Sequence, residues 1–321
     1  MTTKTLCTIC LVLSLVIGLF LILPNRGSAQ SSEGANAHVQ IAMKNVMYHY
    51  TDPIAVRVVQ LQGELLPTKS GEIPVFDDKN SFTLALTSAE IAISCDALAR
   101  VLNQNVFSAS NSPIKDLSIE SKNNQLVIKG KLPRKGDVSF ETTGVLTVEE
   151  DGRIRLHTEH LKAAHLPVKG LLDLLGLDIA RMINTKKIQG ISADKDDLIL
   201  NPEQILPSPH IQGRVTAVRL QGNDIVQVFG RAQGENFAAK QTGNYLAFRH
   251  GDLRFGKLTM RDSDLIMIDM DAHDPFDFYL DHYQDQLVAG YTKSTPAFGL
   301  RAYARDYDKL PHRSLASQRK R

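Results

Sequence analysis

Residues 116–161 read DLSIESKNNQLVIKGKLPRKGDVSFETTGVLTVEEDGRIRLHTEHL, and this stretch indicates most clearly what kind of fold the chain adopts. Apolar and polar residues alternate over short runs, which is typical of strands with one buried face. Turn pairs separate the runs, at Asn123-Asn124, Lys135-Gly136 and Asp151-Gly152. Asparagine and glycine tolerate the left-handed backbone of tight turns. The stretch therefore predicts four short antiparallel strands.

The same alternation continues on both sides of this stretch. It predicts further strands at 39–43, 54–58, 82–86, 214–220, 225–229, 244–249, 256–260 and 265–269. Two helices are expected between them. One spans Ser94–Phe107, where Ser94 can cap the first turn. The other spans Gly170–Asn184 and has a wide, leucine-rich face, which fits either a central core helix or a helix that lines an apolar groove.

The composition is that of an ordinary folded protein, with 321 residues, 43% of them hydrophobic and 22% charged. These values exclude a mostly disordered chain and a collagen. One apolar run is long enough to span a bilayer, which excludes a polytopic membrane protein. The net charge of +2 is too small to indicate nucleic-acid binding.

The N-terminus has the layout of an export signal. Lys4 precedes an apolar run of 18 residues, Leu6–Leu23, and Gly27-Ser28-Ala29 places small residues before a cut at Gln30. Residues 1–29 are therefore expected to be a signal peptide or, because the run is long, an uncleaved membrane anchor. Both alternatives place the rest of the chain in the periplasm or on the outer face of the cytoplasmic membrane.

The remaining chain is divided into a linker at 30–38, one domain at 39–300 with a soft internal boundary near 205, and a basic tail at 301–321. The tail has seven basic and two acidic residues and is expected to be disordered. It could contact anionic lipid headgroups or simply keep the protein soluble. Beyond the exported segment only one cysteine remains, Cys95, which is expected to be a buried structural thiol at the start of the first helix.

Catalytic signatures are absent: the sequence has no G-x-S-x-G, G-x-G-x-x-G, Walker or H-E-x-x-H motif. We therefore expect a protein that is not an enzyme, with no catalytic residues and no cofactor. His157, His160 and His165 do not have the spacing of a zinc site on a strand. A segment at 262–285 has eight aspartates and no Lys or Arg, and its weak calcium candidates are Asp269, Asp271 and Asp274. The simpler interpretation is a solvated acidic loop.

Four segments resemble uncharacterised bacterial envelope proteins of the phospholipid-binding, tubular lipid-binding (TULIP-like) superfamily. They are Ile93-Ser94-Cys95-Asp96-Ala97-Leu98-Ala99, Leu166-Pro167-Val168-Lys169-Gly170-Leu171-Leu172, Asp196-Asp197-Leu198-Ile199-Leu200-Asn201-Pro202 and Ile211-Gln212-Gly213-Arg214-Val215-Thr216-Ala217-Val218. The resemblance implies an α+β fold, in which a curved antiparallel sheet wraps around one or two long helices and encloses an apolar groove. It implies no catalytic residues.

The leading hypothesis is an exported envelope protein that binds or carries a phospholipid or similar apolar ligand. Its partners would be that ligand and a membrane surface, not nucleic acid. The residues expected to line the groove are Leu171, Leu172, Leu175, Ile179, Met182, Ile183, Leu126, Ile128, Phe140, Ile154 and Leu156. Two alternatives stay open: a structural or interaction protein of the envelope with a filled core, and a calcium-dependent envelope hydrolase.

Overall fold

The structure is a computed structural model that describes residues 38–311, except 52–53, 109, 111, 113, 134–135, 164–189, 195–196, 206–207 and 232–235. The chain divides into two compact units, Met1–Asn36 and Ala37–Arg321. The described residues all belong to the second unit.

The described elements are mostly strands. The strands are β1 Val39–Thr51, β2 Ile54–Pro67, β3 Phe82–Ser94, β4 Lys115–Lys122, β5 Gln125–Leu132, β6 Val138–Val148, β7 Ile154–Ala163, β8 Ile191–Asp194, β9 Asp197–Leu200, β10 His210–Gln212, β11 Val215–Gln221, β12 Asp224–Gly230, β13 Tyr245–His250, β14 Leu253–Phe255, β15 Leu258–Met260, β16 Ser263–Asp269, β17 Phe276–Tyr279, β18 Tyr291–Ser294 and β19 Leu300–Ala304. The helices are α2 Cys95–Val101, η1 Leu102–Val106, α4 Pro202–Ile205, η3 Leu280–His282 and α5 Tyr283–Val288.

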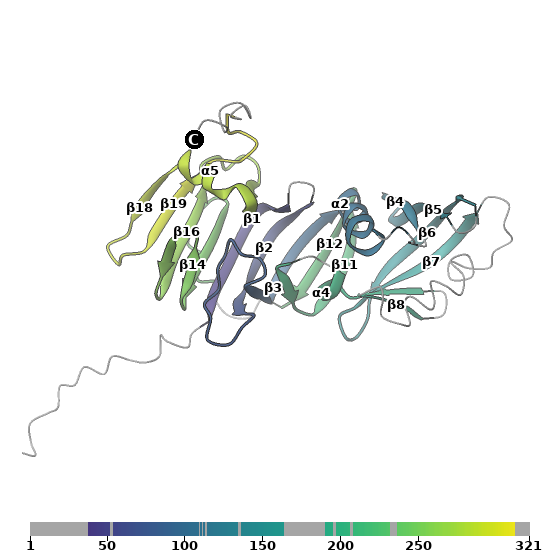
Figure 1. The fold of residues 1–321 in the computed structure, drawn as a ribbon, viewed down its shortest axis with the longest axis horizontal. Helices are drawn as coiled ribbons and strands as arrows, with labels where there is room; N and C mark the ends of the chain where they lie inside the picture. The colour runs from purple at the N-terminus through teal and green to yellow at the C-terminus, as the bar shows by residue number, and fades with distance from the viewer. Residues whose placement is uncertain are drawn as a thin grey trace, which may run out of the picture. The chain divides into compact units, whose positions relative to one another are not determined.

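Two sheets carry most of this unit (Figure 1). The large sheet has the strand order β11-β12-β3-β2-β1-β13-β16-β19-β18, with β10 beside β3 and β17 beside β1. The six-stranded sheet has the order β4-β5-β6-β7-β9-β8. The short hairpin β14-β15 forms a separate pair. Helix α2 contacts strands of both large assemblies, β2 and β3 on one side and β4 on the other.

The expected fold class, a curved sheet wrapped around long helices, is wrong. Strands make up 57% of the described residues and helices about 11%. The longest helix among the described residues, α2, has 7 residues. The prediction required a long helix to cover the apolar faces of the strands. In the structure, other strands and loops cover them. The helix expected at 170–184 lies outside the described residues.

An aromatic cluster shows how the large sheet is covered. Phe76, on the irregular segment between β2 and β3, lies at its centre and is 1% exposed. Its ring centroid is 4.8 Å from that of Phe248 on β13, 5.1 Å from that of Phe255 on β14 and 6.2 Å from that of Phe278 on β17. These rings fill the space above the sheet at the close spacing of aromatic pairs.

The local signals in the sequence fold as expected. Asn123 and Asn124 have φ values of 53° and 59° in the β4–β5 turn, and Gly152 has φ 87° in the β6–β7 turn. Ser94 caps α2, since its side-chain oxygen accepts a hydrogen bond from the Ala97 N–H at 3.1 Å. These turns and this cap depend on neighbours in the sequence, so the sequence predicts them directly.

Two asparagines, one on η1 and one in the β11–β12 turn of the large sheet, form hydrogen bonds to β4 of the six-stranded sheet. The Asn103 side chain donates to the Leu117 carbonyl at 2.8 Å and accepts from the Leu117 N–H at 3.1 Å. The Asn223 side chain, in the β11–β12 turn, accepts from the Ser121 N–H at 2.9 Å. Because each amide satisfies backbone groups of β4, the two sheets are connected by hydrogen bonds as well as by apolar packing.

The C-terminal part of the domain extends further than the sequence suggested. Strand β19 spans Leu300–Ala304, so the boundary expected at residue 301 falls inside a strand. Residues 312–321 of the expected tail lie outside the described residues. No helix among the described residues combines the length and the apolar character that crossing a membrane requires.

The turn between β18 and β19, Thr295–Gly299, has an unusual residue at its left-handed position. Phe298 has φ 61°. The turn is closed by hydrogen bonds from the Thr295 N–H to the Gly299 carbonyl at 2.7 Å and from the Phe298 N–H to the Thr295 carbonyl at 2.9 Å. Glycine is the usual residue in this conformation, since an L side chain there costs about 1–2 kcal/mol.

We expect Phe298→Gly to leave the free energy of unfolding unchanged or to raise it by about 0.5 kcal/mol. Relief of the left-handed strain outweighs the greater entropy of glycine in the unfolded chain. Denaturant titration of the two proteins measures the difference. A loss of stability greater than about 1 kcal/mol would show that the Phe298 side chain contributes to the fold.

Candidate functional site

The five predicted ligand-lining residues on strands lie on one face of the six-stranded sheet. Residues directly opposite each other in an antiparallel pair point to the same side. Ile128 lies opposite Thr142, Leu126 opposite Gly144, Phe140 opposite Gly130 and Ala163, Leu156 opposite Leu146, and Ile154 opposite Val148. We call this side of β5, β6 and β7 the apolar face. The structure therefore brings these five predicted residues together.

Most positions of the apolar face are buried, and a few are only partly buried. Leu126, Phe140, Ile154 and Leu156 are 2–5% exposed, whereas Ile128 and Leu146 are only partly buried. Helix α2 and η1 pack on β4, and β11 packs on β6.

Two glycines let side chains lie flat on the apolar face. A Cβ atom at Gly130 would be 2.9 Å from the Phe140 ring, and one at Gly144 would be 2.6 Å from the Leu156 side chain. Both distances are too short for a carbon–carbon contact, so these positions accept only glycine without a shift of the neighbour. The result is a smooth apolar surface.

The six remaining predicted lining residues, Leu171 to Ile183, lie outside the described residues. Their place in the chain is nevertheless informative. Residues 164–189 connect β7, which ends at Ala163, to β8, which begins at Ile191. Both strands belong to the six-stranded sheet. The leucine-rich segment is thus an insertion within the same sheet that carries the apolar face.

The opposite side of the six-stranded sheet is charged and its charges are paired. Lys129 Nζ is 2.9 Å from Glu120 and 3.6 Å from Glu141, and Lys131 Nζ is 2.8 Å from Asp116. Asp116, Lys129, Lys131 and Glu141 are among the residues that line an open hollow of about 420 Å³. Exposed pairs of this kind contribute little to stability. This side has the character of a solvated surface.

The large sheet encloses a small apolar cavity of about 20 Å³ beside Ile41, Tyr48, Leu65, Phe82 and Ile211. This volume is close to that of one water molecule. Pockets that hold small organic ligands have about 300–1,000 Å³. The described core of the large sheet is therefore filled by its own side chains.

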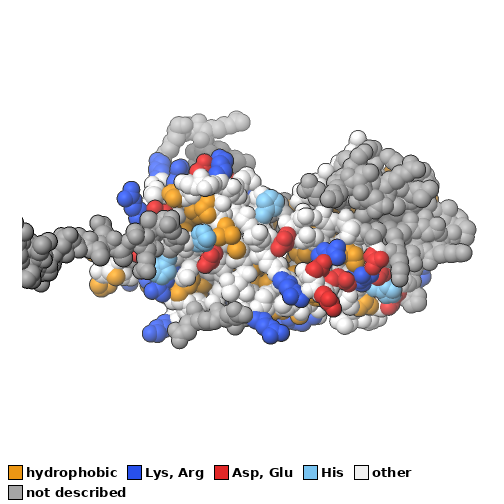
Figure 2. Space-filling view, turned by 90° about the horizontal axis from the view of Figure 1, so that it is seen from below, with side chains coloured by type: hydrophobic (Ala, Val, Ile, Leu, Met, Phe, Trp, Pro, Cys, Tyr) orange, Lys and Arg blue, Asp and Glu red, His pale blue; other side chains and the backbone are white. Residues whose placement is uncertain are grey.

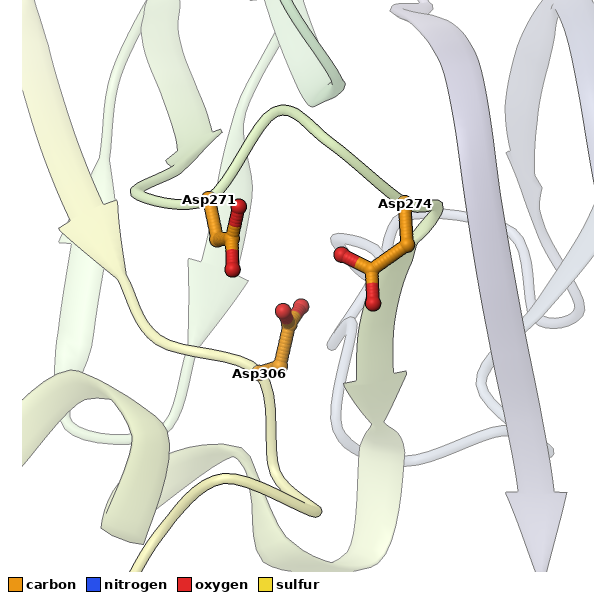
Figure 3. Close-up of side chains that lie close together, drawn as sticks. All are labelled: Asp271, Asp274 and Asp306. Carbon is orange, nitrogen blue, oxygen red and sulfur yellow. The ribbon is translucent and has the colours of Figure 1, made fainter.

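The acidic segment forms a cluster that already holds a cation. Asp271, Asp274 and Asp306 bring carboxylate oxygens within 4.8 Å of one another (Figure 3). The Lys309 ammonium lies 2.8 Å from Asp271, 2.9 Å from Asp274 and 2.9 Å from Asp306. The sequence predicts a disordered tail that includes Lys309 and does not identify Asp306. Lys309 and Asp274 are 35 positions apart, so only the fold brings them together.

Asp269, the third calcium candidate, points elsewhere. It accepts hydrogen bonds from the Asn244 side chain at 2.8 Å and from the Asp271 N–H at 2.7 Å. Burial raises the pKa of Asp269 to about 6. By contrast, the hydrogen bond from Lys309 and the neighbouring His273 lower the pKa of Asp271. The cluster is an ion-pair network in which Lys309 takes the position that a metal ion would occupy.

We expect millimolar calcium to leave the Tm of the native protein unchanged and to raise that of Lys309→Met by more than about 2 °C. Removal of the ammonium leaves three facing carboxylates, which are ligands that calcium prefers. Differential scanning calorimetry at neutral pH measures both effects. Lys257→Met, at an exposed lysine of the β14–β15 turn, serves as the control. A calcium-dependent Tm in the native protein would contradict this assignment.

The cysteine and the histidines considered above as reactive or metal-binding residues show no sign of such a role where the structure describes them. Cys95 is buried, and burial, with Asp224 and Asp96 nearby, raises the pKa of its thiol to about 11. The position at the start of α2 therefore does not activate it. His157 lies exposed on β7, with Nδ1 2.6 Å from Asp197. The His160 side chain and His165 are not among the parts that the structure describes.

No family model, no curated protein and no solved structure matches this chain.

Proposed function

We propose that this chain is an exported, non-enzymatic protein of the bacterial envelope that binds a phospholipid or similar acyl-chain ligand. The ligand lies against the apolar face of the six-stranded sheet. One observation carries this proposal: five residues chosen from the sequence alone, on three strands, share one uncharged face.

Three features of the apolar face support an acyl-chain ligand. At the positions of β5, β6 and β7 whose side chains the structure describes, the face presents aliphatic, aromatic, glycine and threonine side chains, so the expected contacts are non-directional. Ile128 and Leu146 are partly buried, which leaves apolar area for a ligand to cover. Each square ångström covered contributes about 25 cal/mol. The leucine-rich segment 164–189 joins two strands of this sheet.

The export signal predicted from residues 1–29 supports a location outside the cytoplasm. Lys4, the apolar run Leu6–Leu23 and the small residues at 27–29 fit both a cleaved signal and an anchor. An anchor would hold the domain next to a membrane, and a cleaved signal would release it into the compartment between the two membranes; both lie close to a source of phospholipid.

A second candidate function rests on the filled core of the large sheet. The cavity of about 20 Å³ there has no room for an acyl chain. A protein filled in this way throughout would act as a structural or interaction protein of the envelope. The two candidates therefore differ in whether lipid is present in the purified protein.

Lipid extraction tests the proposal. The full chain is expressed with export in a bacterial host, purified in mild detergent, exchanged into detergent-free buffer and extracted with organic solvent. Mass spectrometry of the extract is expected to give close to one phospholipid per chain. Protein that repeatedly contains no lipid, and takes none up from vesicles, would reject lipid binding and favour the structural role.

A further inference from the structure

The β18–β19 turn exposes apolar side chains to solvent. Phe298 is 96% exposed, the highest value among the large hydrophobic side chains of the described chain. Pro296 and Ala297, next to it in the turn, are exposed as well. A contiguous exposed apolar tip of this kind on a folded protein often marks an interaction site.

The backbone at this position gives a second reason to look for a partner. Phe298 takes a left-handed conformation, with φ 61°, that favours glycine. The side chain is fully solvated, so burial within the fold does not compensate for the strain. A costly residue without a contact inside the fold is best explained by a contact outside it.

The turn lies at the end of the large sheet where the described chain begins. Gln40, at the start of β1, is opposite Arg249 on β13, and Arg249 is opposite Asp264 on β16. Leu265, the next residue of β16, is opposite Leu300 at the start of β19. The strand ends therefore run in a row from the N-terminus of β1 to the β18–β19 turn.

Chain length connects this end to the predicted membrane segment. The 14 residues 24–37 link the apolar run Leu6–Leu23 to His38. Fully extended, they span at most about 50 Å. If the apolar run anchors the protein, this linker keeps the end of the sheet that carries the turn within reach of the bilayer.

The charges around the turn favour an anionic partner. The charged residues at this end of β13, β16, β18 and β19, with the turns that flank them, are Arg249, Asp252, Arg261, Asp262, Asp264, Lys293 and Arg301. Four are basic and three are acidic, and Asp264 is paired with Arg301 at 2.8 Å. Arg249, Arg261 and Lys293 are exposed. Figure 2, a view from below, shows orange apolar side chains beside blue Lys and Arg side chains near the left end of the molecule.

We propose that the β18–β19 turn docks on an anionic lipid bilayer, with Phe298 inserted at the level of the headgroups. Lys293, Arg249 and Arg261 then lie near lipid phosphates, where each basic residue strengthens binding. An apolar tip with basic residues behind it is the pattern of a peripheral membrane contact. This proposal goes beyond ligand binding and does not depend on it.

A second copy of the chain is the competing occupant, because β18 is an edge strand and all four of its residues are exposed. Lys293 opposes that pairing. It lies on β18 itself, and lysine on an edge strand disfavours edge-to-edge association. Its ammonium sits 5.4 Å from the ring centroids of Tyr291 and Tyr303.

Tryptophan fluorescence tests the proposal in the full chain. The sequence has no tryptophan, so Phe298→Trp introduces a single reporter. Val288→Trp is the matched control, because Val288 is 80% exposed and lies at the C-terminal end of α5, outside the turn. Each protein is mixed with vesicles of phosphatidylglycerol and phosphatidylethanolamine, or of phosphatidylcholine alone, with and without brominated acyl chains.

With anionic vesicles, Phe298→Trp is expected to shift its emission to shorter wavelength and to be quenched by brominated lipid, and Val288→Trp is expected to do neither. The effect should be weaker with phosphatidylcholine and at high salt. Unchanged emission of Phe298→Trp with anionic vesicles would overturn the proposal. So would equal quenching at both positions, or a shift that appears on raising protein concentration without lipid, which would indicate self-association.

Discussion

Leu146→Lys is expected to reduce the phospholipid that co-purifies with the full chain by at least about tenfold. Leu146 is a partly buried position on the apolar face, opposite Leu156. An ammonium at this position has to be desolvated when an acyl chain covers it, and that cost exceeds the 1.4 kcal/mol that corresponds to a tenfold loss. Lipid extraction and mass spectrometry measure the lipid-to-protein ratio.

Two controls make this result specific. Thr147→Lys adds the same charge at the next residue, which is exposed and points to the other side of β6, and it should retain lipid like the native protein. Leu146→Met keeps an apolar side chain of similar volume and should retain lipid as well. Equal loss of lipid in Leu146→Lys and Thr147→Lys, with melting curves like that of the native protein, would contradict the assignment of the ligand to the apolar face.

Phe76→Ala is expected to lower the free energy of unfolding by about 3–5 kcal/mol. Phe76 is 1% exposed, and its ring contacts aromatic side chains from the separate strands β13 and β14. Truncation removes the transfer energy of the ring and leaves a cavity that rigid strands cannot close. Equilibrium denaturation in urea or guanidinium, followed by circular dichroism, gives the difference.

Phe298→Ala is the matched control for this prediction. It removes the same side chain from a position that is 96% exposed, so the free energy of unfolding should change by less than about 0.5 kcal/mol. A loss below about 1.5 kcal/mol for Phe76→Ala would show that the aromatic cluster is not the centre of the core. It would also mean that other side chains cover the large sheet.

The sequence predicted the local elements well, because their signals lie within a few residues of one another. The hairpin turns at Asn123-Asn124 and Asp151-Gly152 and the cap at Ser94 are formed as expected. The α+β class was wrong, because alternation shows that a strand has an apolar face and does not show what covers it. Phe76 covers the large sheet from an irregular segment between β2 and β3, where apolar residues follow neither the helix nor the strand pattern.

The acidic segment shows the same limit. Alternating Phe276 and Phe278 were available as a signal for β17, but the surrounding aspartates suggested a loop. The position of Lys309 among three carboxylates depends on the return of the chain through β19, which no local pattern predicts. For the ligand site, the strand residues predicted from the sequence do share one face. Side chains alternate between the two sides of a strand, so residues two apart point to the same side.

The measurement that tests the central claim most directly is photocrosslinking from the apolar face. A benzophenone side chain is placed at position 146 or at position 147 of the full chain, in cells that export the protein. After irradiation, the protein is digested and its peptides are examined by mass spectrometry. Our account predicts phospholipid attached at position 146 and none at position 147. Lipid at both positions in equal amounts, or at neither, would contradict it.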